Sequence, residues 1–289
     1  MVFSRSRAGR AVLRRVAYPV VLLAVAGVGF GVIALDWDPA VVSPLFLVGV
    51  VGYFAVLERL IPHNPDWHPD PREWGWYGIY FVLTALGAGI AQMVVSLVVG
   101  WLSPARPGWP FWAEIPAALL LGSLGSYVVH RLGHTNAFLW RFHGVHHVPE
   151  KVNVGNNGVN HVLDIVLAQG VVQVSLALAG FSEPSVFLVG AFVTAQGYFT
   201  HANVEVRIGV LNHVLAGPEQ HRLHHSTDLA EAGHYGSDLA IWDHLFRSYT
   251  WTPGRTPVSV GLVDPTSFPP TSSVVASLLH PLRPRRRSS

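Results

Sequence analysis

The sequence predicts an all-α protein, a polytopic membrane bundle of about four spanning helices and a helical hairpin, with a cytoplasmic, histidine-rich helical cap. Three observations predict this class. Half of the 289 residues are hydrophobic and only 12% are charged, whereas a soluble domain carries about 25% charged residues. Apolar runs of spanning length recur through the first half of the chain. Twelve of the 16 histidines lie between His130 and His234.

Composition also excludes several kinds of chemistry. The chain has no cysteine, which excludes disulfides, iron–sulfur clusters, thiolate-ligated haem and cysteine nucleophiles. The mean hydropathy is +0.36 and the pI is about 9.1, with arginine concentrated at the two ends of the chain, beside apolar segments. This distribution favours attraction to anionic lipid headgroups over binding of nucleic acid.

The first two spans follow an arginine-rich start. Five arginines lie within residues 1–15, and an apolar run extends from Val16 to Leu35. This run is too long for the apolar core of a signal peptide and can cross a ~30 Å hydrocarbon core, so it predicts a membrane anchor. After a short turn at 36–39, a second span is expected from Ala40 to Ile61.

Two further spans lead to the histidines. The third is expected from Trp76 to about Leu102, with tryptophans around the loop that follows it, as in an interfacial aromatic belt. The fourth, 113–129, leads directly to His130. Residues 163–181 and 184–200 predict a helical hairpin. Each arm is at the short end for a full crossing, so a crossing hairpin and a re-entrant one both stay open.

The distribution of positive charge predicts the topology. With the N-terminus inside and every span crossing once, the outside loops are 36–39, 103–112 and 182–183. Only Arg106 of the 19 lysines and arginines lies in these loops, as the positive-inside rule requires. The N-terminus, the histidines and the C-terminus are therefore expected on the cytoplasmic side, of a bacterial cytoplasmic membrane.

The histidines recur at helical spacing. Positions i, i+3 and i+4 share one face of a helix, and imidazole is the commonest metal ligand in proteins. Eight histidines in three clusters are too many for one tetrahedral zinc, so they predict a cap that holds two metals. The clusters are His130 and His134; His143, His146 and His147; and His221, His224 and His225.

These clusters and their flanks resemble the fatty acid hydroxylase/sterol desaturase superfamily of membrane di-iron oxygenases. The supporting segments are LWRFHGVHHVPE (139–150), FTHANV (199–204), PEQHRLHHSTD (218–228) and WDHLFRSY (242–249). The resemblance covers roughly residues 75–250. The chain departs from the family pattern at His234, where many members have asparagine in Asn-Tyr-Gly, and at 159–162, which keeps a histidine without the family's arginine and proline.

The resemblance implies a cofactor, a reaction and partners. Two iron ions, with zinc able to substitute in isolated protein, would be held mainly by imidazole. O2 and electrons from a separate reductase would then hydroxylate or desaturate a lipid at a C–H position. Which lipid, and whether the product is an alcohol or an alkene, stays open. The implied ligands are the eight clustered histidines, with His201, His161 and His234 as further candidates.

Other side chains have expected roles as well. Four aspartates are candidates to orient imidazole N–H groups: Asp164, Asp228, Asp238 and Asp243. Five histidines are expected not to be ligands: His63, His68, His213, His244 and His280.

The predicted domains are N-terminal anchor helices (1–74), a catalytic domain (75–252) and a basic C-terminal tail (253–289). The first alternative function is a zinc-dependent membrane hydrolase or lyase using the same histidine cage. A metal-binding transporter or structural membrane protein is a weaker alternative; a transporter should place ionisable residues within its spans, and the predicted spans are almost free of charge.

Overall fold

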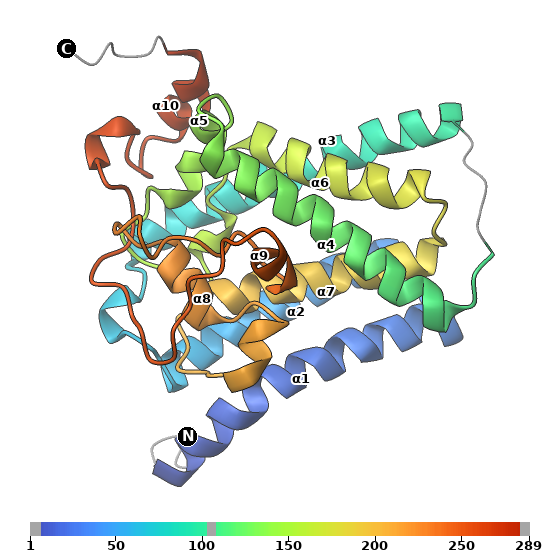
Figure 1. The fold of residues 1–289 in the computed structure, drawn as a ribbon, viewed down its shortest axis with the longest axis horizontal. Coiled ribbons are helices and arrows are strands. Elements are labelled where there is room, and N and C mark those ends of the chain that lie inside the picture. The colour runs from blue at the N-terminus through green and yellow to red at the C-terminus, as the bar shows by residue number, and fades with distance from the viewer. Residues whose placement is uncertain (1–6, 103–107, 284–289) are drawn as a thin grey trace.

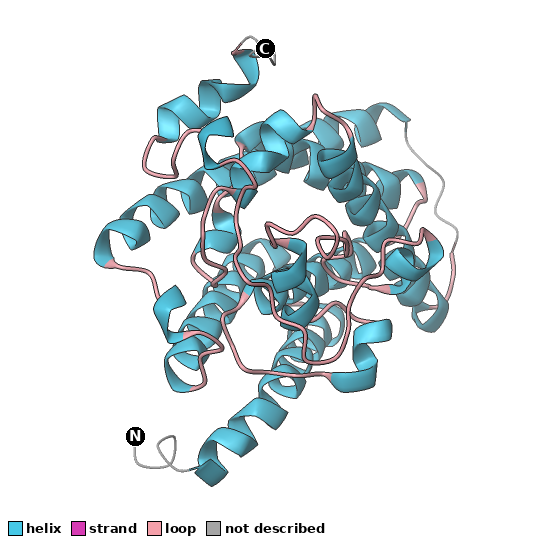
Figure 2. Ribbon diagram, turned by 60° about the vertical axis from the view of Figure 1, so that its left-hand side comes forward, coloured by secondary structure: helices cyan, strands magenta, loops and turns pink. Residues whose placement is uncertain are grey.

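The structure is a computed structural model that describes residues 7–102 and 108–283. Within these ranges every regular element is a helix, as Figure 2 shows. The six long helices are α1 (Arg7–Ala34), α2 (Pro39–Leu60), α3 (Pro71–Leu102), α4 (Phe111–Thr135), α6 (Val162–Leu178) and α7 (Glu183–His201). The predicted all-α class is confirmed.

Four of these helices are long and apolar enough to cross a membrane: α1, α2, α3 and α4. They coincide with the four predicted spans, but α3 begins five residues earlier than expected and α4 continues through the first two histidines. The start of α3 has a local cause, because the Asp70 carboxylate accepts hydrogen bonds from the backbone N–H groups of Arg72 and Glu73. Arg106, the one positive charge expected outside, falls between the described ranges.

The predicted hairpin consists of α6 and α7, which turn at Gly180, a glycine with positive φ. With 17 and 19 residues, they are ~26 and ~29 Å long. Both lie inside the bundle: α6 packs against α3 and α4, and α7 packs against α1, α2 and α4. The hairpin therefore forms walls of the bundle's interior.

The short helices gather at one end of the bundle, beside the described ends of the chain (Figure 1). They form a cap from loops and single helical turns. Its members are η2 (Pro65–Trp67), α5 (Trp140–His143), η3 (Gly144–His147), η4 (Asn156–Gly158), η5 (Gly209–His213), α8 (Pro218–His224), α9 (Ile241–Leu245), η6 (Pro265–Ser267), α10 (Val274–Leu279) and η7 (His280–Leu282).

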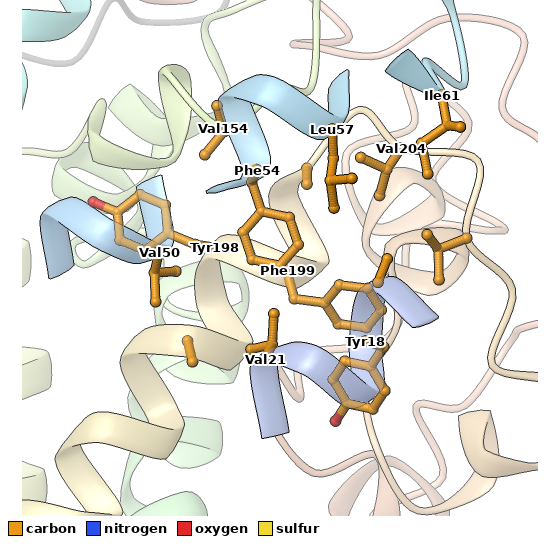
Figure 3. Close-up of a cluster of buried hydrophobic side chains, with 14 of the residues drawn as sticks. Tyr18, Val21, Val50, Phe54, Leu57, Ile61, Val154, Tyr198, Phe199 and Val204 are labelled. Atoms are coloured by element: carbon orange, nitrogen blue, oxygen red, sulfur yellow. The ribbon is translucent and has the colours of Figure 1, made fainter. Parts of the chain in front are cut away.

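An apolar core joins α1 and α2 to the cap end of α7 (Figure 3). Tyr18 of α1 stacks on Phe199 of α7 with ring centroids 4.2 Å apart, and Phe54 of α2 lies 5.9 Å from the same ring. Beside this core the buried Glu58 carboxylate accepts hydrogen bonds from the backbone N–H groups of Val154 and Asn203, at 2.6 and 2.8 Å. The N-terminal helices therefore hold the end of α7, where His201 lies.

Candidate metal centre

Nine histidines converge at the junction of the bundle and the cap, in two groups. Within each group, one ring nitrogen from every member lies within 4.8 Å of those of the others. The first histidine group contains His130, His134, His143, His147 and His224. The second histidine group contains His146, His201, His221 and His225.

Helical spacing explains how each cluster divides between the groups. Three pairs are separated by four residues, and each pair stays in one group: His130/His134, His143/His147 and His221/His225. The histidine three positions after the start of a cluster joins the opposite group, as His146 and His224 do. Around an α-helix, as in α4 and α8, residues i and i+4 lie about 40° apart, whereas i+3 and i+4 lie about 100° apart. One turn of helix can therefore supply both groups.

Backbone carbonyls orient four of these nine rings through Nδ1. His130 Nδ1 donates to the carbonyl of Tyr235 (2.6 Å), and His224 Nδ1 donates to that of Gly233 (3.0 Å). In the second group His146 donates to Val159 O (3.2 Å) and His201 to Asn153 O (3.0 Å). A ring that donates through Nδ1 keeps its lone pair on Nε2, which is the form that binds a metal.

Several of the remaining ring nitrogens have no partner among the described residues. Nε2 of His130, His147, His201 and His224, and Nδ1 of His221, are buried without a hydrogen bond. Nε2 of His143 lies 3.1 Å from Nε2 of His134, and Nε2 of His225 lies 3.1 Å from Nε2 of His221. Buried polar atoms are rarely left unsatisfied. Converging lone pairs of this kind fit a cation bound between them.

Burial favours the neutral form of three of these rings. Desolvation, followed by the neighbouring histidines, lowers the pKa of His147, His221 and His225 well below the usual value for histidine. Neutral imidazole is the form that ligates metals. The two groups also adjoin, because the rings of His147 and His225 stack across the boundary with centroids 4.3 Å apart.

One carboxylate reaches these histidines within the described chain. Asp164, in the first turn of α6, accepts a hydrogen bond from Nδ1 of His143 at 3.0 Å. Of the other candidates, Asp243 supports the site indirectly. Its carboxylate accepts hydrogen bonds from the backbone N–H groups of Tyr235 and Gly236, and so holds in place the Tyr235 carbonyl that orients His130. The Asp228 carboxylate accepts a hydrogen bond from the backbone N–H of Ala230, and the Asp238 carboxylate accepts one from the Ser123 hydroxyl.

Known proteins resemble this chain. The family model described as fatty acid hydroxylase matches residues 115–248. The chain is 31% identical to ornithine lipid hydroxylase OlsE of Rhizobium tropici, over 74% of this chain and 69% of that protein. The chain belongs to the fatty acid hydroxylase family. It is also 27% identical to the alkylglycerol monooxygenase of Xenopus tropicalis, over 67% of this chain and 46% of that protein. No solved structure matches the chain.

Membership confirms the resemblance read from the histidine clusters. This fatty acid hydroxylase family protein is an oxidoreductase, as its relatives are. The alternative of a zinc hydrolase or lyase is left without support. The chain spans about two thirds of the length of the ornithine lipid hydroxylase and less than half of the alkylglycerol monooxygenase.

Two candidate ligands lie outside both groups in this family member. His161 caps α6: its Nδ1 accepts the N–H of Leu163, and its Nε2 donates to the carbonyl of Leu278 at 3.1 Å. His234 has φ +61° and accepts the N–H of Thr250 through Nε2. Both rings are held by backbone, so the structure does not bring them to the metal centre. Nor does it place there any of the five histidines expected not to be ligands.

Several supporting residues were not predicted from the sequence. Trp140 packs against His134 and His147, with ring centroids 5.2 and 5.6 Å apart. Phe268, from the segment predicted to be a basic tail, packs in turn against Trp140 at 5.8 Å. Orienting carbonyls cannot be recognised from residue type at all. Trp140 lies beside a motif histidine, so its position was the one available hint.

A cavity of about 320 Å³ opens beside the histidines. His130, His143, His146 and His221 line it, so it meets both groups. It extends between α3, α4, α6 and α7, where its walls are largely apolar. A cavity of this size is within the range of small-molecule sites, and members of both histidine groups lie in its wall.

Proposed function

We propose that this chain is an O2-dependent di-iron membrane oxygenase that hydroxylates or desaturates a lipid at a C–H position. Family membership supports lipid oxidation. Two iron ions are proposed because the histidines form two adjoining groups, and each group contains ring nitrogens without a hydrogen-bond partner. Five imidazoles in one group and four in the other would each suffice to hold one iron.

The proposed ligands are the nine grouped histidines: His130, His134, His143, His147 and His224 for one iron, and His146, His201, His221 and His225 for the other. Bound iron would supply the O2 activation that breaking an unactivated C–H bond requires. The protein would contribute orientation, because the carbonyl and Asp164 contacts hold the rings before a metal arrives. The apolar cavity walls would exclude water and align the lipid.

A separate reductase is proposed as the electron donor. The chain contains neither cysteine, for an iron–sulfur cluster, nor a glycine-rich dinucleotide fingerprint. The proposed topology has the N-terminus, the histidine centre and the C-terminus in the cytoplasm, on the basis of the positive charge distribution. Such a donor would therefore be a cytoplasmic or membrane-attached protein.

The substrate is proposed to be a membrane lipid. The names of the relatives make ornithine lipid and alkylglycerols the first two to test. The test uses detergent-purified protein that is loaded anaerobically with Fe(II) and given a reductant, O2 and each lipid. We expect about two irons per chain and O2 uptake that depends on lipid. Gain of one oxygen atom by the lipid would identify a hydroxylase, and loss of two hydrogens a desaturase.

Variants separate the centre from the rest of the chain. His134→Ala and His201→Ala remove one member from each histidine group, and each is expected to lower iron content. Their activity should fall by more than the ~10–100-fold typical of losing an outer supporting partner. His244→Ala is the matched control, because His244 is exposed and stacks on Tyr249 away from both groups. Full turnover in either group variant would overturn the assignment.

A further inference from the structure

Three polar side chains project into the cavity from three helices of the bundle. They are Ser126 of α4, Gln169 of α6 and Thr194 of α7. None of them makes a side-chain hydrogen bond to any residue that the structure describes. Their neighbours along the cavity wall include Ile165, Ala168 and Val193, which offer no hydrogen-bonding groups.

Several other polar side chains in the same cavity are already bonded to the protein. The Thr84 hydroxyl donates to the carbonyl of Gly158 at 2.9 Å, and the Asn160 amide donates to that of Asn157 at 2.9 Å. Asp164 accepts from His143. A polar side chain between apolar helices is costly without a partner. Ser126, Gln169 and Thr194 are half-buried at the cavity and are free to bond a group from outside the chain.

Their depth along the helices is similar. Ser126 lies four residues before His130, Gln169 five residues after Asp164, and Thr194 seven residues before His201. At 1.5 Å per residue, the three side chains lie ~6–10 Å from the histidine level, on the side of the cavity that runs into the bundle. They form a polar belt across this part of the cavity.

We propose that this polar belt (Ser126, Gln169 and Thr194) binds an uncharged carbonyl linkage of the lipid, an amide or an ester. The linkage is uncharged because none of the three side chains ionises, and an unpaired buried charge would be far more costly. Gln169 offers both a donor and an acceptor, which suits an amide in particular. The inference rests on the proposed function and names its substrate class.

The geometry also sets which carbon reacts. An extended chain advances ~1.2 Å per bond, so a linkage held ~6–10 Å from the histidine level places the oxidised carbon about five to eight bonds from that carbonyl. The enzyme would then measure its reaction site from the linkage and not from the end of the alkyl chain.

Binding to metal-free, full-length protein tests the belt separately from catalysis. The probes are a dialkyl secondary amide, the corresponding dialkyl ester and the hydrocarbon of equal length, with affinities measured by native mass spectrometry in one detergent. Wild-type protein should prefer the amide to the hydrocarbon by about tenfold, the effect of one or two buried hydrogen bonds. The ester has no N–H, so a lower affinity for the ester than for the amide would show that the amide N–H donates a hydrogen bond to the protein.

Matched variants assign the preference to the belt. Gln169→Leu should abolish most of the preference for the amide, and the nearly isosteric Thr194→Val should reduce it. Ser175→Ala on the same helix as Gln169 is the control, because the Ser175 hydroxyl is already bonded to the carbonyl of Val171. An equal preference in wild type and Gln169→Leu, or no preference in wild type, would overturn the proposal.

The iron-loaded protein gives an independent readout. A series of dialkyl amides of constant length, with the amide moved along the chain, should be oxidised at a constant number of bonds from the carbonyl. Oxidation at a constant distance from the chain end would refute the belt while leaving the oxygenase assignment intact. A metal-free preference for the amide in a protein that never consumes O2 would support the belt and refute the proposed function.

Discussion

Asp164 shows how a single outer carboxylate can support the metal centre. Its side chain and that of His143 are 12% and 9% exposed, so their contact is shielded from solvent. Its position in the first turn of α6 also places the negative charge at the favourable end of the helix dipole. Carboxylates that receive the second nitrogen of a ligating histidine fix the orientation and tautomer of the ring.

Asp164→Ala should therefore lower iron affinity or lipid oxidation by about 10–100-fold. Asp164→Asn should cost less, because an amide oxygen can still accept the Nδ1 hydrogen. The measurement is iron content after dialysis, together with the rate of O2 uptake. Equal activity in wild type and Asp164→Ala would show that carbonyl contacts alone orient the histidines.

His234 is explained by its backbone conformation. Its φ of +61° lies in the left-handed region, which asparagine, aspartate and histidine adopt more readily than other non-glycine residues. Burial, with a smaller contribution from His244, lowers the pKa of His234 from 6.5 to about 3. The unfolded chain therefore binds a proton between about pH 6.5 and 3 that the folded protein does not bind.

The stability that His234 contributes is thus present above pH 6.5 and is lost as the pH falls toward 3. His234→Asn, which suits the same conformation, should fold normally and lose less stability on acidification, with a pH slope smaller by one proton. His234→Ala should be less stable at neutral pH. Thermal unfolding in detergent from pH 8 to 4 measures both effects. Loss of bound iron in His234→Asn would show that His234 is a ligand after all.

At the scale of elements, the described C-terminal segment closes over the metal centre. Gly261 donates its backbone N–H to the carbonyl of His225, and Arg141 bonds the carbonyl of His280. Phe268 stacks on His280 at 4.2 Å and covers Gly144, where an added Cβ would collide with its ring. The domain boundary predicted at residue 252 therefore has extensive packing across it.

Phe268→Ala should destabilise the protein by about 3 kcal/mol, the low end of the range for truncating a buried phenylalanine. It should also speed iron loss to a chelator, because Trp140 loses the ring that holds it against His134 and His147. Leu282→Ala is the control, since Leu282 is 80% exposed on the same segment. A lower melting temperature with unchanged iron loss would mean that the segment stabilises the fold without retaining the metal.

At the scale of the whole molecule, the proposed topology can be measured directly. The chain contains no cysteine, so a single introduced cysteine is the only residue that a thiol reagent labels. Asp36 lies between α1 and α2, Arg72 begins α3, and Glu183 lies at the turn of the α6–α7 hairpin; all three are exposed.

In intact cells an impermeant maleimide should label Asp36→Cys and Glu183→Cys, and should reach Arg72→Cys only after permeabilisation. This pattern follows if the N-terminus is inside and each helix of the hairpin crosses the bilayer. Labelling of Glu183→Cys only after permeabilisation or solubilisation would mean that the hairpin is re-entrant. Labelling of Arg72→Cys from outside would reverse the whole topology.

Much of this architecture could be predicted because its causes are local. Apolar runs of spanning length form helices wherever they occur, and histidines four residues apart meet on one turn. The four spans, the hairpin and the eight clustered histidines all follow from such spacing. His201 was predicted through a short family segment, and the structure brings it to the second histidine group.

Long-range packing decided the rest. Which clusters combine to form each group depends on how α4, α7 and α8 approach one another around η3. The carbonyls of Asn153, Val159 and Tyr235 became orienting groups only because loops distant in sequence pass the rings. His161 and His234 looked like ligands by type, but local backbone bonds hold them elsewhere. Spacing along one helix determined the chemistry available, and the packing between helices decided where it is used.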